Sequence, residues 1–300
     1  MGETLKRILS GLVIAAFYIL AFNAKWPYYL ILYLFCLVFG LLSLREFFYL
    51  FESYSKNKKS RKLEYLFGTA LLTIFYFDLL KSEKTNIEFI NFFLEYFTLN
   101  YNLIIGFFII YLFGVLIREL KSGSIENAFN SIGTAFSAVV YIIIPISHLF
   151  LLLKLKDGVF FIWLVSWSTV MSDTMAYFSG KSFGKHKIGF VISPNKTYEG
   201  YIGGLIGQLM LTHLFYYIVR SYFDITFFTF IEITIFGIII YAASILGDLS
   251  ESLLKRNSGK KDSGNIIPGH GGMLDLIDAL LFTIPGFYHT YNIINYFNNI

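Results

Sequence analysis

Long apolar runs separated by short polar segments constrain this chain more than any other feature of its sequence. A helix needs about 20 largely apolar residues to cross a bilayer, and lipid offers no hydrogen-bond partners to an open backbone. The runs therefore predict an all-α polytopic membrane protein with about nine transmembrane helices. The predicted spans are 6–23, 28–51, 63–80, 101–120, 131–154, 158–178, 201–220, 228–247 and 273–292.

The composition supports this class and excludes others. Hydrophobic residues make up 56% of the chain and charged residues only 15%, against about 25% charged residues in soluble domains. A soluble enzyme with a single anchor could not cover so much apolar surface. The net charge of +4 is small, and no basic patch is interleaved with stacking aromatics, which argues against nucleic acid as a partner. The single cysteine, Cys36, excludes an internal disulfide.

Two segments allow alternative interpretations. The first apolar run follows Lys6 and Arg7 and could be a signal peptide. We expect a retained helix, because no small-residue cleavage site follows and another hydrophobic helix comes almost at once. The segment 84–98 has apolar residues at helical spacing and predicts an interfacial amphipathic helix, with a loop as the alternative.

The distribution of basic residues predicts the orientation. With the N-terminus in the cytoplasm, eighteen of the 24 Lys and Arg residues fall on the cytoplasmic side, as the positive-inside rule requires. The loops 179–200 and 248–272 then share the cytoplasmic face. We expect 1–125 to be N-terminal, lipid-facing scaffold helices and 126–300 to be a C-terminal transmembrane catalytic region that carries both loops.

Acidic side chains gather at the ends of two predicted helices. Asp248, Glu251 and Ser252 share one helical face, and Asp275 and Asp278, three residues apart, share another. Acids near a membrane need partners, and Mg²⁺ typically takes one or two carboxylates together with substrate phosphates. Asp248 and Asp275 are therefore the first candidates for metal ligands, with Glu251 as a third. Helix capping and salt bridges with nearby bases are the alternative.

Basic residues and glycines lie between these acids. Lys255, Arg256, Lys260 and Lys261 can donate charge-assisted hydrogen bonds to phosphate oxygens. The glycines of Pro268–Gly272 allow close approach of backbone N–H groups to an anion. His270 could bind phosphate or transfer a proton, or be structural.

A second polar segment lies upstream. Ser172 and Asp173 stand near the end of one predicted helix, and Lys196, Thr197 and Glu199 precede the next. Lys196 could hold a phosphate, and Thr197 could cap the helix. A basic juxtamembrane loop is the alternative. No Walker A motif is present, and the absence of HExxH and CxxC spacing argues against zinc.

These residues resemble the phosphatidate cytidylyltransferase (CDP-diacylglycerol synthase) family. Its signature is similar to S-x-x-K-R-x4-K-D-x-[GSA]-x2-[LIF]-[PG]-x-H-G-G-x-x-D-R-x-D, and residues 252–278 match it closely. The upstream S-D-T-x-A-Y, F-G-K-H and I-S-P-x-K-T-x-E-G elements also match. Leu276 stands where the family usually has Arg, which puts one phosphate contact in doubt. Met175 and Tyr198 are minor departures.

The resemblance implies that CTP and phosphatidic acid are converted to CDP-diacylglycerol and pyrophosphate. It implies Mg²⁺ at Asp248 and Asp275, with a second cation left open. It also implies a homodimer in a bacterial plasma membrane with its site open to the cytoplasm. Lys261 and Asp278 complete the expected catalytic set. The expected substrate-binding residues are Ser172, Asp173, Lys196, Thr197, Glu199, Ser252, Lys255, Arg256, Asp262, His270, Gly271 and Gly272.

Other function classes stay open on the sequence. A CTP-dependent lipid kinase would use the same membrane setting but release CDP. A membrane transporter or non-catalytic scaffold is a different class. The acids gather at one predicted face rather than along a path through the midplane, which disfavours transport.

Overall fold

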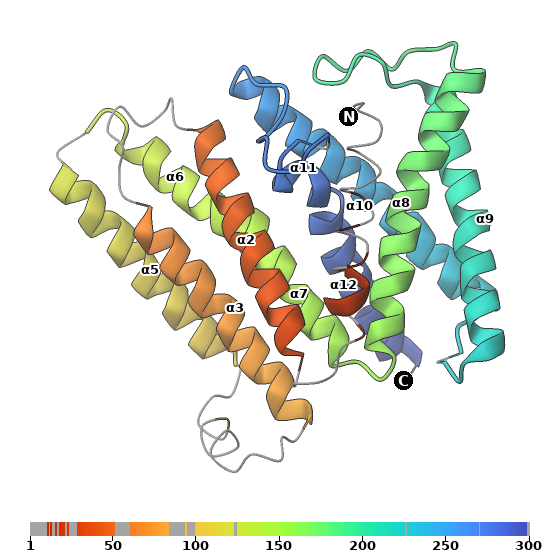
Figure 1. Ribbon diagram of the computed structural model, residues 1–300, viewed down its shortest axis with the longest axis horizontal. Helices are drawn as coiled ribbons and strands as arrows, with labels where there is room; N and C mark the ends of the chain where they lie inside the picture. The colour runs from red at the N-terminus through yellow and green to blue at the C-terminus, as the bar shows by residue number, and fades with distance from the viewer. Residues whose placement is uncertain are drawn as a thin grey trace. The chain divides into compact units, whose positions relative to one another are not determined.

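A computed structural model describes residues 29–51, 61–83, 100–122, 125–225, 227–269 and 271–298, with Leu94 and scattered residues between 11 and 23. The described part is helical, and its β-structure is limited to two isolated bridges. The helices are α2 (Leu30–Leu50), α3 (Lys62–Glu83), α5 (Tyr101–Ser122), α6 (Ala128–Ala138), the π-helical η2 (Val139–Ile143), α7 (Ile144–Leu153), α8 (Gly158–Phe183), α9 (Tyr198–Tyr222), α10 (Phe230–Asn257), α11 (Met273–Ile277) and α12 (Leu280–Asn298) (Figure 1).

The predicted all-α polytopic class is confirmed. Seven helical segments among the described residues are long and apolar enough to cross a membrane. One of them, Ala128–Leu153, combines α6, η2 and α7. The predicted first span, 6–23, lies largely outside the described residues, as does the predicted interfacial helix 84–98 apart from Leu94.

Two predicted boundaries near the polar segments are wrong. The span predicted to end at 247 continues as a helix to Asn257, so the loop predicted at 248–272 begins only after that residue. Asp248, Glu251 and Ser252 lie on one helix, α10, as their spacing predicted. Its last turn carries Lys255 and Arg256, cations that stabilise the C-terminal end of a helix. In the same way, α8 continues past the predicted end at 178 to Phe183.

The predicted helix 273–292 is broken. It consists of the short α11 and the longer α12, with Asp278 in the turn between them. Asp275 and Asp278 therefore do not share a helical face, contrary to the prediction. The Asp278 carboxylate accepts the backbone N–H of Ala279 at 2.6 Å, and such local side-chain bonds compete with the helical backbone pattern.

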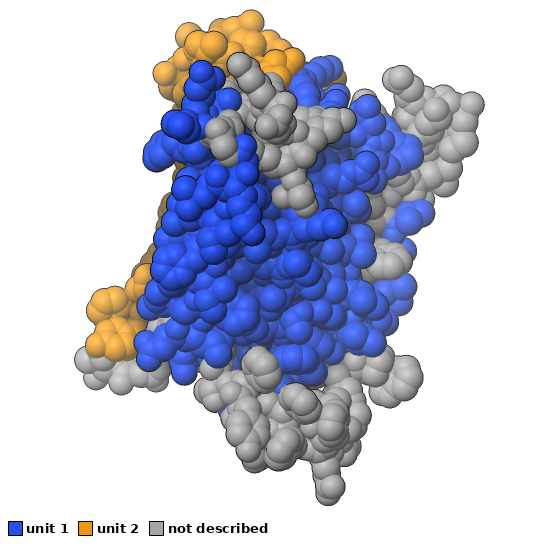
Figure 2. Space-filling model, turned by 90° about the vertical axis from the view of Figure 1, so that its left-hand side faces the viewer, with its two compact units in different colours: residues 1–154, 260–276 blue, residues 155–259, 277–300 orange. Residues whose placement is uncertain are grey.

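The chain packs as two compact units, which Figure 2 colours separately. Unit 1 comprises residues 1–154 and 260–276, and unit 2 comprises 155–259 and 277–300. The segment 260–276, which holds most of the signature, is thus grouped with the N-terminal helices. The functional division expected at residue 125 stays a prediction.

Unit 1 is built by close packing of α2, α3 and η2. A Cβ added at Gly40 or Gly68 would lie 3.3 Å or 3.1 Å from the Ile143 side chain, so these glycines let the helices approach. The Tyr111 hydroxyl on α5 donates to the carbonyl of Ala135 on α6 at 2.9 Å. This bond ties the outer helix α5 to the core of the unit.

A buried ionic cluster joins α3, α5 and α6 in the same unit. The Arg118 guanidinium pairs with Glu64 and, at 3.1 Å, with Glu119. Glu119 also accepts the Ser131 hydroxyl at 2.8 Å. Because both acids are buried, each requires these partners to offset its desolvation.

Unit 2 rests on close contact between α8 and α9. Glycines at four-residue spacing on α9 face small parts of α8, the pattern that allows membrane helices to approach closely. A Cβ added at Gly203 would lie 2.4 Å from the Ser179 hydroxyl, and one at Gly204 would lie 2.8 Å from the Ala176 Cβ. α10 and α12 pack against this pair.

Candidate active site

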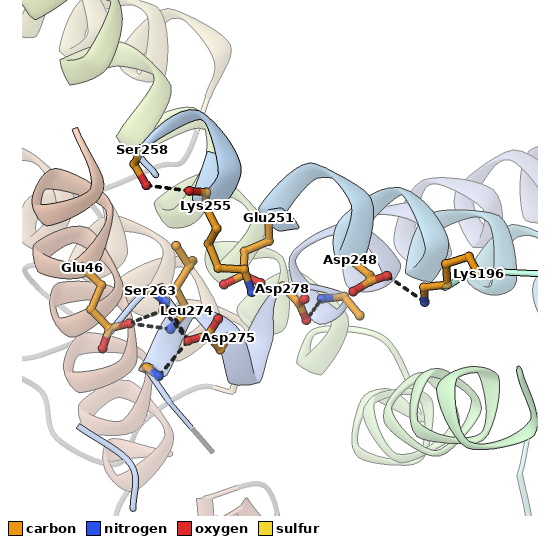
Figure 3. Close-up of polar contacts among 12 residues, drawn as sticks. Glu46, Lys196, Asp248, Glu251, Lys255, Ser258, Ser263, Leu274, Asp275 and Asp278 are labelled. Atoms are coloured by element: carbon orange, nitrogen blue, oxygen red, sulfur yellow. Dashed lines mark hydrogen bonds and ion pairs between the residues drawn. The ribbon is translucent and has the colours of Figure 1, made fainter. Parts of the chain in front are cut away.

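Asp248 and Lys196 form the centre of the polar group in unit 2. Figure 3 shows the two side chains pointing toward each other, with 2.9 Å between Lys196 Nζ and Asp248 Oδ2. Each side chain is about one third exposed. Burial alone would lower the pKa of Lys196, but the Asp248 carboxylate more than offsets it, so this pKa lies above its ordinary value. Asp248 is therefore a carboxylate that already takes a cationic partner.

The loop before α9 is held in a defined shape, which positions Lys196. An isolated bridge pairs Lys187 with Thr197, and the Ile188 N–H donates to the Lys196 carbonyl at 3.0 Å. Thr197 is the N-cap of α9 and accepts the Gly200 N–H at 3.1 Å, which confirms its predicted capping role. The capped helix and the bridge together fix the base of Lys196.

Glu199 and Ser172 have surroundings that the sequence did not reveal. The Glu199 carboxylate contacts the His186 ring at 2.5 Å and accepts the His186 backbone N–H. It therefore closes the same loop. Ser172 is buried, while its neighbour Asp173 is exposed and lies 3.5 Å from the Ser244 hydroxyl of α10. Their predicted contacts with substrate stay predictions.

The α12 turn approaches α10 beside Asp248. A Cβ added at Gly247 would lie 2.6 Å from the Asp278 carbonyl oxygen, so only a glycine fits there. Burial and the nearby carboxylates of Asp248 and Asp173 raise the pKa of Asp278 to about 7, against the opposing effect of its bond to the Ala279 N–H. Asp278 lies outside the seven candidate spans. Unit 2 thus brings Asp173, Asp248 and Asp278 into one electrostatic neighbourhood.

One turn further along α10, Glu251 is buried and pairs with Lys255 at 2.5 Å. This i, i+4 pair directs the lysine along the helix. Ser252 is half-buried and Arg256 is exposed on the same helix.

Asp275 is the centre of the polar group in unit 1. Its Oδ2 accepts the Ser263 N–H at 2.9 Å, the Ser263 hydroxyl at 2.8 Å and the Gly272 N–H at 2.8 Å (Figure 3). The preceding loop folds back through paired bonds between Ile267 and Gly271. Gly271 has φ of 96°, and a Cβ there would lie 2.8 Å from Asp275 Oδ2. The signature glycines therefore shape the loop around this carboxylate.

The remaining signature residues are placed less specifically. Lys261 and Asp262 are exposed, Leu276 is half-buried, and His270 lies outside the described residues. Among the residues that the structure describes, no three Asp, Glu, His or Cys side chains are close enough to form a metal site by themselves.

Glu46 and Ser263 were not among the residues predicted from the sequence. Glu46 lies on α2 and accepts hydrogen bonds from the segment that holds Asp275 (Figure 3). An acid inside the apolar run 30–50 was a usable signal, because acids in membrane helices are costly and usually functional. Ser263 carried no comparable signal.

Comparisons with known proteins confirm the resemblance found in the sequence. The family model described as the cytidylyltransferase family matches residues 5–294. A phosphatidate cytidylyltransferase of Bacillus subtilis (strain 168) is 39% identical over 184 residues, which are 59% of this chain and 65% of that protein.

Two further relatives carry the same name. The Haemophilus influenzae protein (strain ATCC 51907 / DSM 11121 / KW20 / Rd) is 41% identical over 151 residues, 49% of this chain and 47% of its own length. The protein of Thermotoga maritima (strain ATCC 43589 / DSM 3109 / JCM 10099 / NBRC 100826 / MSB8) is 34% identical over 186 residues, 62% of this chain and 68% of its own length. The chain thus spans about half to two thirds of the length of these relatives. The match over nearly all of its residues shows that the chain belongs to the cytidylyltransferase family.

Proposed function

We propose that this protein transfers the cytidylyl group of CTP to phosphatidic acid, giving CDP-diacylglycerol and pyrophosphate. The observation that carries the proposal is the family match over residues 5–294, with relatives named phosphatidate cytidylyltransferase. The contacts of the signature residues support it, because acids, bases and glycines of the kind that handle phosphates are each held in fixed surroundings.

The proposed reaction asks little covalent chemistry of the protein. A phosphate oxygen of phosphatidic acid attacks the α-phosphorus of CTP and forms the new P–O bond. The bond from the α-phosphorus to the oxygen bridging to the β-phosphate breaks, and pyrophosphate leaves with that electron pair. The protein must bring two anions together and neutralise the charge on the leaving group.

Asp248 and Asp275 are the proposed ligands for Mg²⁺, which when bound would neutralise phosphate charge. Each supplies the oxygen donors that Mg²⁺ prefers, and substrate phosphates and water would complete the shell. Asp248 already pairs with an ammonium group. The pairing of Glu251 with Lys255 favours a role in orienting that lysine over direct metal binding.

The basic residues are the proposed phosphate contacts. Lys196 is protonated at neutral pH, because its pKa lies above the ordinary value. Lys255 is held by Glu251, while Arg256 and Lys261 are exposed and able to reach a soluble nucleotide. These four cations can offset most of the negative charge of a triphosphate and a lipid phosphate.

The setting of the proposed reaction follows from the charge distribution and the relatives. The positive-inside rule favours a cytoplasmic site, where CTP is made. The bacterial relatives support a bacterial plasma membrane as the location. A homodimer is proposed from the family resemblance alone, and crosslinking of the protein in its native membrane would test it.

A product assay with position-specific label tests the activity. Purified protein in lipid is incubated with Mg²⁺, phosphatidic acid and CTP labelled at the α- or the γ-phosphorus. Label from the α-position in the lipid fraction supports cytidylyl transfer. Label only from the γ-position would show a lipid kinase, and no labelled lipid from either would reject both enzymes.

Asp248→Asn and Asp275→Asn test the metal assignment. Each should lower activity on the order of 100-fold or more, because a metal ligand supports several kcal/mol of charge stabilisation. Asp224→Asn, in the exposed loop after α9, is the matched control and should keep wild-type turnover. Wild-type turnover in either ligand variant would contradict the assignment.

A further inference from the structure

Glu46 is a buried acid on α2, one of the N-terminal helices that the sequence analysis expected to be scaffold. It is only 3% exposed, yet its carboxylate accepts three hydrogen bonds. The donors are the Met273 N–H at 2.9 Å, the Leu274 N–H at 2.8 Å and the Ser263 hydroxyl at 3.1 Å. All three lie in the signature segment, more than 200 positions further along the chain. A buried carboxylate needs such donors to offset its desolvation.

In this chain the Glu46 carboxylate lies close to two signature glycines. A Cβ added at Gly264 would lie 2.4 Å from Glu46 Oε1. One at Gly272 would lie 2.5 Å from Glu46 Oε2 and 2.2 Å from the Ser263 hydroxyl. The segment thus fits closely around this one carboxylate.

The same few residues hold Asp275. Ser263 and Gly272 donate their N–H groups to Asp275, while Met273 and Leu274 donate theirs to Glu46. The Ser263 hydroxyl lies within hydrogen-bond distance of both carboxylates, and its single proton can bond to one at a time. The two carboxylates therefore depend on the same short stretch of backbone. Loss of the hydrogen bonds to one carboxylate should displace the other.

A further contact joins the segment to α2 one turn beyond Glu46. The Lys260 ammonium donates to the Tyr49 carbonyl at 2.6 Å and lies 3.1 Å from the centre of its ring. The segment is thus attached to α2 near its beginning and again at α11.

We propose that Glu46 is a positioning residue that fixes the segment 260–275 and thereby sets the orientation of Asp275. The effect on catalysis rests on the proposed function. The tie itself, which consists of the hydrogen bonds from Ser263, Met273 and Leu274 to Glu46, does not. It assigns to an N-terminal helix a part in building the site, in addition to any scaffold role.

Glu46→Gln tests the tie, because one carboxylate oxygen is replaced by an NH₂ group that cannot accept a backbone N–H. Amide hydrogen exchange is followed in the peptide containing Met273 and Leu274, with no substrate present. We expect exchange about tenfold faster than in the wild type, because a buried donor loses its partner. Glu119→Gln, a buried acid of the same unit, is the matched control and should leave this peptide protected.

The kinetic readout separates positioning from loss of fold. In Glu46→Gln, kcat should fall by about 10- to 100-fold, the usual effect of disturbing a residue that supports a ligand. The thermal midpoint should match that of Glu119→Gln, whose kcat stays near wild type. Wild-type exchange and kcat in Glu46→Gln would overturn the inference, as would equal effects of the two variants.

A second variant covers failure of Glu46→Gln to fold. Gly272→Ala, at a glycine for which the signature allows no other residue, pushes the segment off Glu46 without removing the carboxylate, and should give the same fast exchange and low kcat. Gly133→Ala, where an added Cβ meets nothing within 4 Å, is its control. Wild-type exchange in Gly272→Ala would reject the tie. If the wild type forms no cytidine lipid while fast exchange appears, the tie stands and the proposed function fails.

Discussion

Asp278 is the residue whose protonation should shape the pH dependence of stability. Its folded pKa of about 7 lies above the ordinary value of 3.8, because burial and neighbouring carboxylates disfavour its charged form. As pH rises from about 4 to 7, the unfolded chain loses this proton first, so the folded state loses stability across that window. Above pH 7 the effect levels off.

Asp278→Asn should remove this part of the pH dependence. In EDTA, the thermal midpoint of the wild type should fall relative to that of the variant between pH 5 and pH 8. Asp224→Asn, at an exposed loop position, should follow the wild type. Parallel curves for the wild type and Asp278→Asn would show that Asp278 is already ionised in the folded protein at pH 5, and would contradict its raised pKa.

The sequence predicted the identity of the signature residues better than their surroundings. Asp248, Asp275 and Lys196 could be selected because charged side chains next to a membrane are costly unless they have a partner or a function. Their immediate partners could not, because Glu46 contacts Ser263 across more than 200 positions. Such contacts are set by tertiary packing, which leaves no local pattern.

At the scale of helices, the glycines of α9 determine how closely it packs on α8. A Cβ added at Gly204 would lie 2.8 Å from the Ala176 Cβ and 3.0 Å from its Cα, both of which are fixed by the helix backbone. Gly204→Ala should therefore push the two helices apart.

We expect Gly204→Ala to destabilise the protein by about 1–3 kcal/mol, the usual cost of overpacking. Gly106→Ala on α5, where an added Cβ meets nothing within 4 Å, is the control. It should be neutral or slightly stabilising, because Ala favours a helix over Gly. Thermal unfolding in one detergent compares the two, and an equal midpoint would contradict close packing at Gly204.

Helix positions followed from apolar length, whereas helix ends did not. The window of about 20 residues placed α2, α3, α5, α8 and α9 well, because that length reflects bilayer thickness. It ended α10 ten residues early, because polar residues can continue a helix into the headgroup region. It also missed the break at Asp278, where the side chain accepts a backbone N–H.

At the scale of the whole molecule, the sequence predicted a polytopic protein but not its grouping into units. Apolar content alone excludes a soluble fold. The segment 260–276 packs with the N-terminal unit, although its neighbours in sequence on both sides belong to the other. Hydropathy reports only the partition between water and lipid, so it carries no information on which helices pack together.

The orientation in the membrane can be tested on α9 alone. Lys185, Lys187 and Lys196 precede this helix, and Arg220 lies near its other end, so the positive-inside rule places its N-terminal end in the cytoplasm. Cys36 is the only cysteine, and Cys36→Ser provides a background without thiols. In that background, Val191→Cys, at a position 95% exposed, places a thiol before α9, and Asp224→Cys places one after it.

A membrane-impermeant maleimide should label Asp224→Cys in right-side-out vesicles and Val191→Cys only in inverted ones, because the reagent cannot cross the bilayer. The reverse pattern would put Lys196 and Thr197 on the side without CTP and end the case for cytidylyl transfer at this site.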